Sequence, residues 1–138
     1  MSNKSKRVAA LVEHHEKLDA HYAGYFKQFN HQKYYEAHDV LEHLWLKDKL
    51  GPDGAFYKGL IQLAGAFVHL QRDHLKPAAA LFKLADANFE KYPPVHHHLD
   101  LNAVRGLVAQ WLGDLARSDF QVNPLTAANM PKLTLLPH

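Results

Sequence analysis

The stretch of residues 31–48 constrains the fold most, because it is apolar over most of the circumference of a helix. Its remaining polar side carries only Glu36, Asp39, His43 and Lys47. A helix that is apolar nearly all round must be covered by neighbours on several sides. We therefore expect residues 31–48 to form a central helix of a bundle rather than a helix at its edge.

Four other stretches repeat apolar residues at intervals of three and four positions, which is the spacing of an amphipathic helix. Glycine and proline pairs separate several of these stretches, and no stretch alternates in the manner of a strand. The sequence therefore predicts an all-α fold, a compact bundle of about five helices. The predicted helices cover residues 5–29, 31–48, 55–72, 76–90 and about 100–117.

The last twenty residues, 119–138, contain three prolines and so cannot continue as one helix. They also contain four leucines, which favour burial over exposure to water. We expect an ordered, extended tail that lies on the bundle. At this length, residues 1–138 are expected to form a single domain.

The composition excludes several classes of function. The chain has no cysteine, so disulfides, thiolate metal sites and cysteine nucleophiles are excluded. Its most apolar window, residues 60–70, is shorter than the ~20 residues of a membrane span, so no membrane association is expected. A net charge of +2 with scattered lysines and arginines argues against nucleic-acid binding. A cytoplasmic location is the expectation.

One face of the helix at 31–48 carries an unusual set of side chains. Tyr35, His38, Glu42 and Trp45 follow one another at offsets of three, four and three residues, so they share one side of the helix. Two ionisable groups thus lie between two large aromatic rings. Groups of this kind are seldom buried without polar partners, so we expect partners on a neighbouring helix.

Those partners are expected on the next helix. The turn at residues 51–54 is short, so the helices on either side form an antiparallel hairpin that covers about residues 31–72. Reflection about the turn places Gln62 and His69 on either side of His38 and Glu42. Four polar side chains are therefore predicted to converge between two largely apolar helices.

Three interpretations of this cluster remain open. The first is a structural hydrogen-bond network in which Glu42 accepts from His38 and Gln62. The second is a divalent metal site for zinc, iron or manganese, with His38, Glu42 and His69 as ligands, in a metal-dependent hydrolase. The third is a metal-free acid–base pair that binds or turns over a small polar ligand.

A function in protein–protein contact is a further alternative, since the helices that are apolar nearly all round could supply the face of a homo-oligomer. The run His96-His97-His98 invites comparison with metal sites, but it follows a Pro-Pro pair in a connection between helices. We expect its histidines to point in different directions. The run is interpreted as a solvated linker with adventitious affinity for metals.

The segments 34–45 and 57–64 resemble a known family. Their sequences, Tyr-Tyr-Glu-Ala-His-Asp-Val-Leu-Glu-His-Leu-Trp and Tyr-Lys-Gly-Leu-Ile-Gln-Leu-Ala, follow Phe29-Asn30 in the order and at the spacing of the bacterial and archaeal family called domain of unknown function 309. The resemblance covers about residues 29–70 and implies a small helical bundle without implying a reaction. It implies importance for Glu36, His38, Glu42, Trp45, Gly59, Gln62 and His69.

Glu36 is the residue that the resemblance adds to the cluster. It lies on the polar side of its helix, far round from His38. We therefore expect its carboxylate to bond to another helix end or to the tail.

Overall fold

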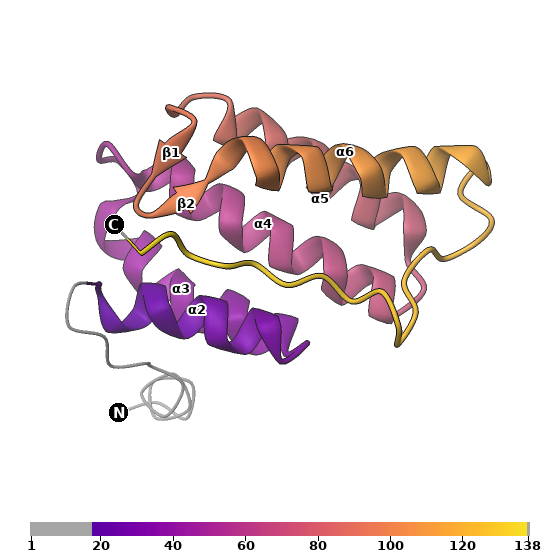
Figure 1. The fold of residues 1–138 in the computed structure, drawn as a ribbon, viewed down its shortest axis with the longest axis horizontal. Coiled ribbons are helices and arrows are strands. Elements are labelled where there is room, and N and C mark those ends of the chain that lie inside the picture. The colour runs from indigo at the N-terminus through magenta and orange to yellow at the C-terminus, as the bar shows by residue number, and fades with distance from the viewer. Residues whose placement is uncertain (1–17, 138) are drawn as a thin grey trace.

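The computed structural model describes residues 18–137, in which five helices and one short hairpin are found (Figure 1). The helices pack compactly and the hairpin has only two residues in each strand, so the predicted all-α class is confirmed. The elements are α2 (Ala20–Asn30), α3 (Tyr34–Asp48), α4 (Gly54–Gln71), α5 (Leu75–Phe89), β1 (Val95–His96), β2 (Leu99–Asp100) and α6 (Leu101–Arg117).

The central helix is α4, and not the helix at 31–48 that the sequence analysis expected. Helix α4 packs between α3 and α5, while α2 packs against α3 and α6 against α5. The C-terminal half of α3 is more exposed than its apolar sequence suggests, and Leu46 is 54% exposed. The reason is length, because α2 begins at Ala20 and is four residues shorter than the 15-residue α3. Among the described residues, the last turns of α3 therefore extend past α2.

The first predicted helix also differs from the structure. A continuous helix over 5–29 is wrong where the structure describes it, because α2 begins only at Ala20. The Asp19 carboxylate accepts hydrogen bonds from the backbone N–H groups of His21, at 2.7 Å, and Tyr22, at 3.3 Å. This N-cap starts a helix at a point where apolar periodicity alone predicts an uninterrupted one. The predicted residues 5–17 lie outside the described residues.

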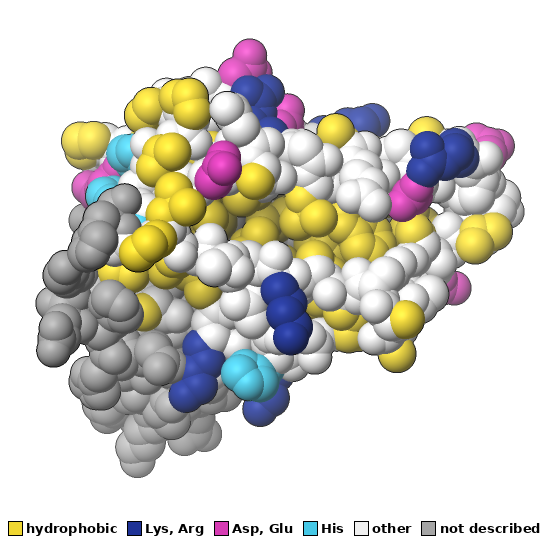
Figure 2. All heavy atoms as spheres, in the orientation of Figure 1, with side chains coloured by type: hydrophobic (Ala, Val, Ile, Leu, Met, Phe, Trp, Pro, Cys, Tyr) yellow, Lys and Arg dark blue, Asp and Glu magenta, His cyan; other side chains and the backbone are white. Residues whose placement is uncertain are grey.

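The chain after α6 runs back along the bundle between α2 and α6 (Figure 1). Leu133 is buried, and its backbone forms two hydrogen bonds with the side chain of Asn30. The Leu136 N–H donates to the carbonyl of His98 at 2.7 Å, so this segment also reaches the hairpin. Figure 2 shows hydrophobic side chains gathered in a band across this face, between α6 and the returning chain.

No helix within residues 18–137 combines the length and the apolar character that crossing a bilayer demands.

Candidate functional site

A cavity of about 360 Å³ lies between α3, α4 and α5. Its wall combines apolar surface with several groups that can donate hydrogen bonds. No aspartate or glutamate is among the described residues that line it. The lining residues are Tyr35, His38, Lys58, Ile61, Gln62, Gly65, Val68, His69, Arg72 and Leu81.

Four of the eight residues that the sequence pattern and the family resemblance single out line this cavity, namely Tyr35, His38, Gln62 and His69. The first two come from α3 and the other two from α4. Both helices of the predicted hairpin thus contribute polar side chains to one space. The rings of Tyr35 and His38 are stacked with centroids 6.2 Å apart, which fixes the imidazole against the α3 side of the cavity.

His38 lies between two carboxylates. Its Nδ1 is 3.2 Å from Oδ1 of Asp39, and its Nε2 is 3.7 Å from Oε2 of Glu42. Glu42 therefore adjoins the cavity through His38 and does not line it. Both ring nitrogens of His38 therefore face a carboxylate, one on each edge of the imidazole.

Gln62 connects the cavity to α5, which the sequence did not suggest. Its Oε1 accepts a hydrogen bond from Nδ2 of Asn88 at 2.8 Å. The two helices are close here, because a Cβ on Gly59 would lie 2.7 Å from the ring of Phe89. Gly59 is thus required for the close packing of α4 on α5, and this packing positions the Gln62 amide.

His69 is the most constrained of the lining groups. Its Nδ1 is buried and has no hydrogen-bond partner among the described residues. Burial lowers the pKa of the His69 imidazole, and the positive charges of His74 and Arg72 lower this pKa further. The neutral form is therefore favoured, because an imidazolium would need partners for both of its N–H groups.

The other two predicted residues lie beside the cavity. Trp45 is half-buried, and the ammonium of Lys58 lies 4.4 Å from the centre of its ring. This cation–π contact holds a lysine that also lines the cavity. Glu36 lies in the first turn of α3, is partly buried and is not among the lining residues.

Three charged residues near the cavity were not identified from the sequence. Asp39 is expected from the sequence on the polar side of its helix, but it is buried and only 2% exposed. An ideal projection of this one helix does not reveal that the position is covered in the folded chain. Lys58 and Arg72 were also missed, because single basic residues on a helix carry no signal of their own in one sequence.

The structure does not bring His38, Glu42 and His69 together as a set of metal ligands. Within residues 18–137, the group of histidine and acidic residues whose ligand atoms all lie within 4.8 Å of one another is Asp53, His96 and His97. The geometry therefore lends no support to the hydrolytic metal centre that the sequence suggested for the α3–α4 cluster.

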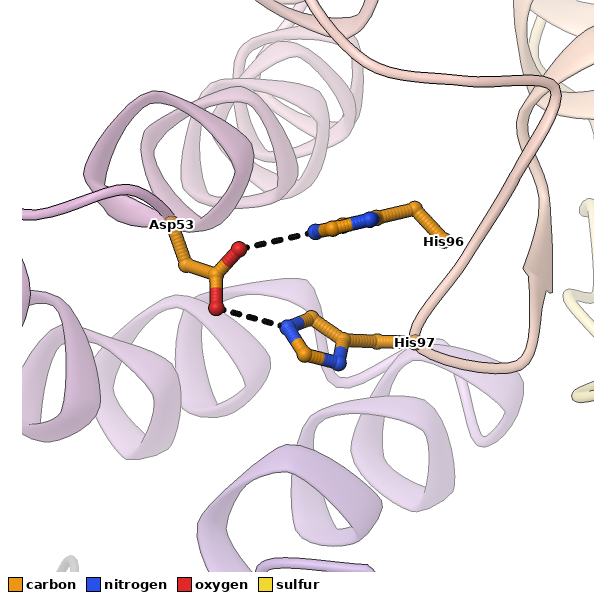
Figure 3. A group of neighbouring side chains, drawn as sticks. All are labelled: Asp53, His96 and His97. Carbon is orange, nitrogen blue, oxygen red and sulfur yellow. Dashed lines mark hydrogen bonds and ion pairs between the residues drawn. The ribbon is translucent and has the colours of Figure 1, made fainter.

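The second cluster corrects the interpretation of the histidine run (Figure 3). His96 and His97 do not point in different directions, because their Nε2 atoms lie 2.8 and 2.7 Å from the two oxygens of the Asp53 carboxylate. Burial alone would raise the pKa of the Asp53 carboxyl. Hydrogen bonds from His97 and His96 outweigh burial and hold this pKa below its ordinary value.

The comparison with known families agrees with the motif in α3 and α4. Residues 22–81 match the model of the family described as domain of unknown function (DUF309), so the resemblance inferred from the sequence is confirmed. The match covers most of α2, all of α3 and α4 and the first half of α5, and it includes every predicted site residue. No curated protein and no solved structure matches the chain.

Proposed function

We propose that this protein, with its domain of unknown function 309 in residues 22–81, binds a small organic anion in the cavity between α3, α4 and α5. The observation that carries the proposal is the chemistry of the cavity wall. Lys58 and Arg72 supply two cationic groups, and no described acidic residue lines the same space to neutralise them.

The volume and the apolar part of the wall limit the kind of ligand. A cavity of about 360 Å³ is at the lower end of the range for small-molecule sites. Tyr35, Ile61, Val68 and Leu81 offer surface for a flat or branched apolar body. A carboxylate or phosphate monoester with an aromatic or aliphatic body fits both requirements.

The polar lining residues would contact different parts of the ligand. Lys58 would pair with the anionic group, and the Gln62 amide, one helical turn further along α4, would donate a hydrogen bond to its oxygens. Arg72 lies 14 residues from Lys58, about 21 Å along the helix axis, and would add positive potential at the other end of the cavity. Lys58 is already held against Trp45, so less side-chain entropy is lost when the ligand binds. The neutral His69 would contact the apolar body or accept a hydrogen bond.

Isothermal titration calorimetry with benzoate and phenyl phosphate tests the proposal. Benzamide has the shape of benzoate without its charge and serves as the matched ligand control. We expect saturable binding of one equivalent of at least one of the anions and much weaker binding of benzamide. A purely structural role for the cluster predicts no saturable binding of any of the three compounds, and that result would refute the proposal.

The chain offers a matched pair of lysine variants. Lys58 and Lys49 both lie near the ring of Trp45, at 4.4 and 5.9 Å from its centre, but only Lys58 is among the residues that line the cavity. A charge-assisted hydrogen bond contributes about 1.5–3 kcal/mol. We therefore expect Lys58→Gln to weaken anion binding about tenfold to a hundredfold, and Lys49→Gln to leave it nearly unchanged. Equal effects of both variants would contradict a cavity site.

A further inference from the structure

We infer that Asp53, His96 and His97 form a binding site for a divalent transition-metal ion of the kind that accepts imidazole nitrogen and carboxylate oxygen, represented by Zn²⁺. The site lies where the loop before α4 meets the β1–β2 hairpin (Figure 3). Its residues are distinct from those that line the α3–α4–α5 cavity. A test of the metal site is therefore independent of a test of anion binding in the cavity.

The ligand atoms are already close to the geometry that a metal requires. Both Nε2 atoms face the same carboxylate, and the three residues can each offer an atom within 4.8 Å of the others. Around a tetrahedral ion with ligand distances of about 2.1 Å, ligand atoms lie about 3.4 Å apart. The present contacts of 2.7–2.8 Å would lengthen to about this value when the ion binds.

The hairpin turn that presents the histidines is well fixed. His97 and His98 both have positive φ, 46° and 62°, and form a two-residue turn between the paired strands. The hydroxyl of Tyr22 donates to the His97 carbonyl at 2.8 Å. From the other side of the turn, the Leu136 N–H donates to the His98 carbonyl. The backbone of the site is thus held from α2 and from the returning chain.

Aromatic rings hold the imidazoles in the same way. The ring of His96 contacts the rings of Phe56 and Tyr92, each with centroids 4.8 Å apart. The ring of His97 is nearly parallel to that of Tyr57, at an interplanar angle of 5°. Packing of this kind limits the rotamers of both ligands, so the two imidazoles are oriented before a metal binds.

Asp53 is available as a ligand because it does not cap its helix. It occupies the N-cap position of α4, yet its side chain accepts no hydrogen bond from the α4 backbone. Asp53 and His96 are each 23% exposed and His97 is 42% exposed, so an ion can enter from solvent. Three protein ligands leave a coordination position for water or for an exchangeable ligand.

A bound ion would join parts of the chain that are far apart in sequence. Asp53 is 43 residues from His96 and 44 from His97. The metal would therefore connect the α3–α4 turn to the hairpin before α6, and its binding free energy would add to the stability of the fold.

Zinc titration of the untagged full-length chain by calorimetry, with His98→Gln as the matched control, tests the inference. His98 belongs to the same turn but not to the predicted ligand set. We expect one equivalent of Zn²⁺ to bind, and affinity to fall more than about tenfold in Asp53→Asn, His96→Gln and His97→Gln, since even outer-shell changes cost about that much. His98→Gln should bind like the wild type.

Two results would overturn the site. The first is an Asp53→Asn variant that binds zinc as well as the wild type. The second is a His98→Gln variant that loses as much affinity as His97→Gln, because adventitious binding to a histidine run makes no distinction between them. Circular dichroism verifies that each variant folds, and His97→Gln, at the most exposed ligand, decides the question if Asp53→Asn does not fold.

A spectroscopic readout is independent of affinity. With Co²⁺ in place of zinc, we expect intense visible absorption bands of a four-coordinate ion in the wild type and in His98→Gln, and their loss in Asp53→Asn. The weak spectrum of a hexaaqua ion in the wild-type protein would contradict the assignment. Thermal unfolding should likewise shift to higher temperature with zinc in the wild type, but not in Asp53→Asn.

Discussion

Asn30 and Leu133 form a reciprocal pair of hydrogen bonds, in which the side-chain amide of one imitates a neighbouring strand for the backbone of the other. Asn30 Nδ2 donates to the Leu133 carbonyl at 2.7 Å, and the Leu133 N–H donates to Asn30 Oδ1 at 2.7 Å. Leu133 is 103 residues further along the chain and is buried. This pair joins the C-terminal end of α2 to the segment that follows α6.

The pair gives a prediction for the returning chain. Asn30→Ala would leave both backbone groups of Leu133 without partners in a half-buried place, which costs about 1–3 kcal/mol. Urea unfolding should show this loss, and limited proteolysis should cleave residues 121–137 faster. Asn129→Ala, which removes comparable bonds at an exposed position, is the control and should cost less. Equal resistance of Asn30→Ala and the wild type to protease would contradict the pair's role.

Two buried tyrosines offer a comparison within the core. The Tyr25 hydroxyl donates to the Leu60 carbonyl at 2.6 Å, whereas the Tyr34 hydroxyl is buried without a hydrogen-bond partner in the described part of the chain. Burial raises the pKa of Tyr34 to about 12. Tyr25→Phe should therefore cost about 1 kcal/mol, while Tyr34→Phe should be neutral or slightly stabilising. Chemical denaturation of both variants checks this, and the reverse order of stability would contradict it.

The lowered pKa of His69 makes a prediction about pH. The folded state holds this imidazole less protonated than the unfolded state, where its pKa is near 6.5. Its contribution is therefore fully present above pH 6.5 and is lost as the pH falls from 6.5 towards the folded pKa. The His69→Leu variant has no imidazole at this position, so it does not lose stability in this way as the pH falls. The stability of the variant relative to the wild type should rise between pH 7.5 and 5.5, as measured by urea unfolding. A difference that does not change with pH would contradict the assignment.

Most helix boundaries could be predicted because turn chemistry and periodicity agree along most of the chain. Helices α3 to α6 begin and end within three residues of the predicted positions, and the junctions before α4 and α6 carry proline together with glycine or a capping aspartate. The start of α2 could not be predicted, because the cap at Asp19 competes with an apolar periodicity that continues through it. At this point a single side-chain cap decides where the helix starts.

The two clusters differ in how much the sequence could reveal. The α3–α4 cluster was accessible because a short turn fixes the register of two neighbouring helices, so that Tyr35 and His38 could be aligned with the second helix. The cluster of Asp53, His96 and His97 was not, because its partners are brought together by α4, α5 and a hairpin turn with unusual backbone angles. The spacing of these residues in the sequence does not reveal that the chain folds back and brings His96 and His97 to Asp53.

The burial of Asp39 is another feature that the sequence pattern alone does not predict. Its position on the polar side of α3 is correct by projection, yet the carboxylate there is buried and lies beside Nδ1 of His38. Amphipathicity predicts which side of a helix prefers water. Which sides are covered depends on the lengths and crossing of the neighbouring helices.

The most direct test of anion binding in the cavity is an NMR titration of the histidine side chains with benzoate or phenyl phosphate. His69 lines the cavity and His21, which stacks on His43 on the other side of α3, supplies an internal control in the same spectrum. Burial lowers the pKa of both imidazoles. We predict a saturable shift of the His69 resonances, with the resonances of His21 unchanged. Saturation without any movement of His69, or equal movement of both residues, would contradict the account.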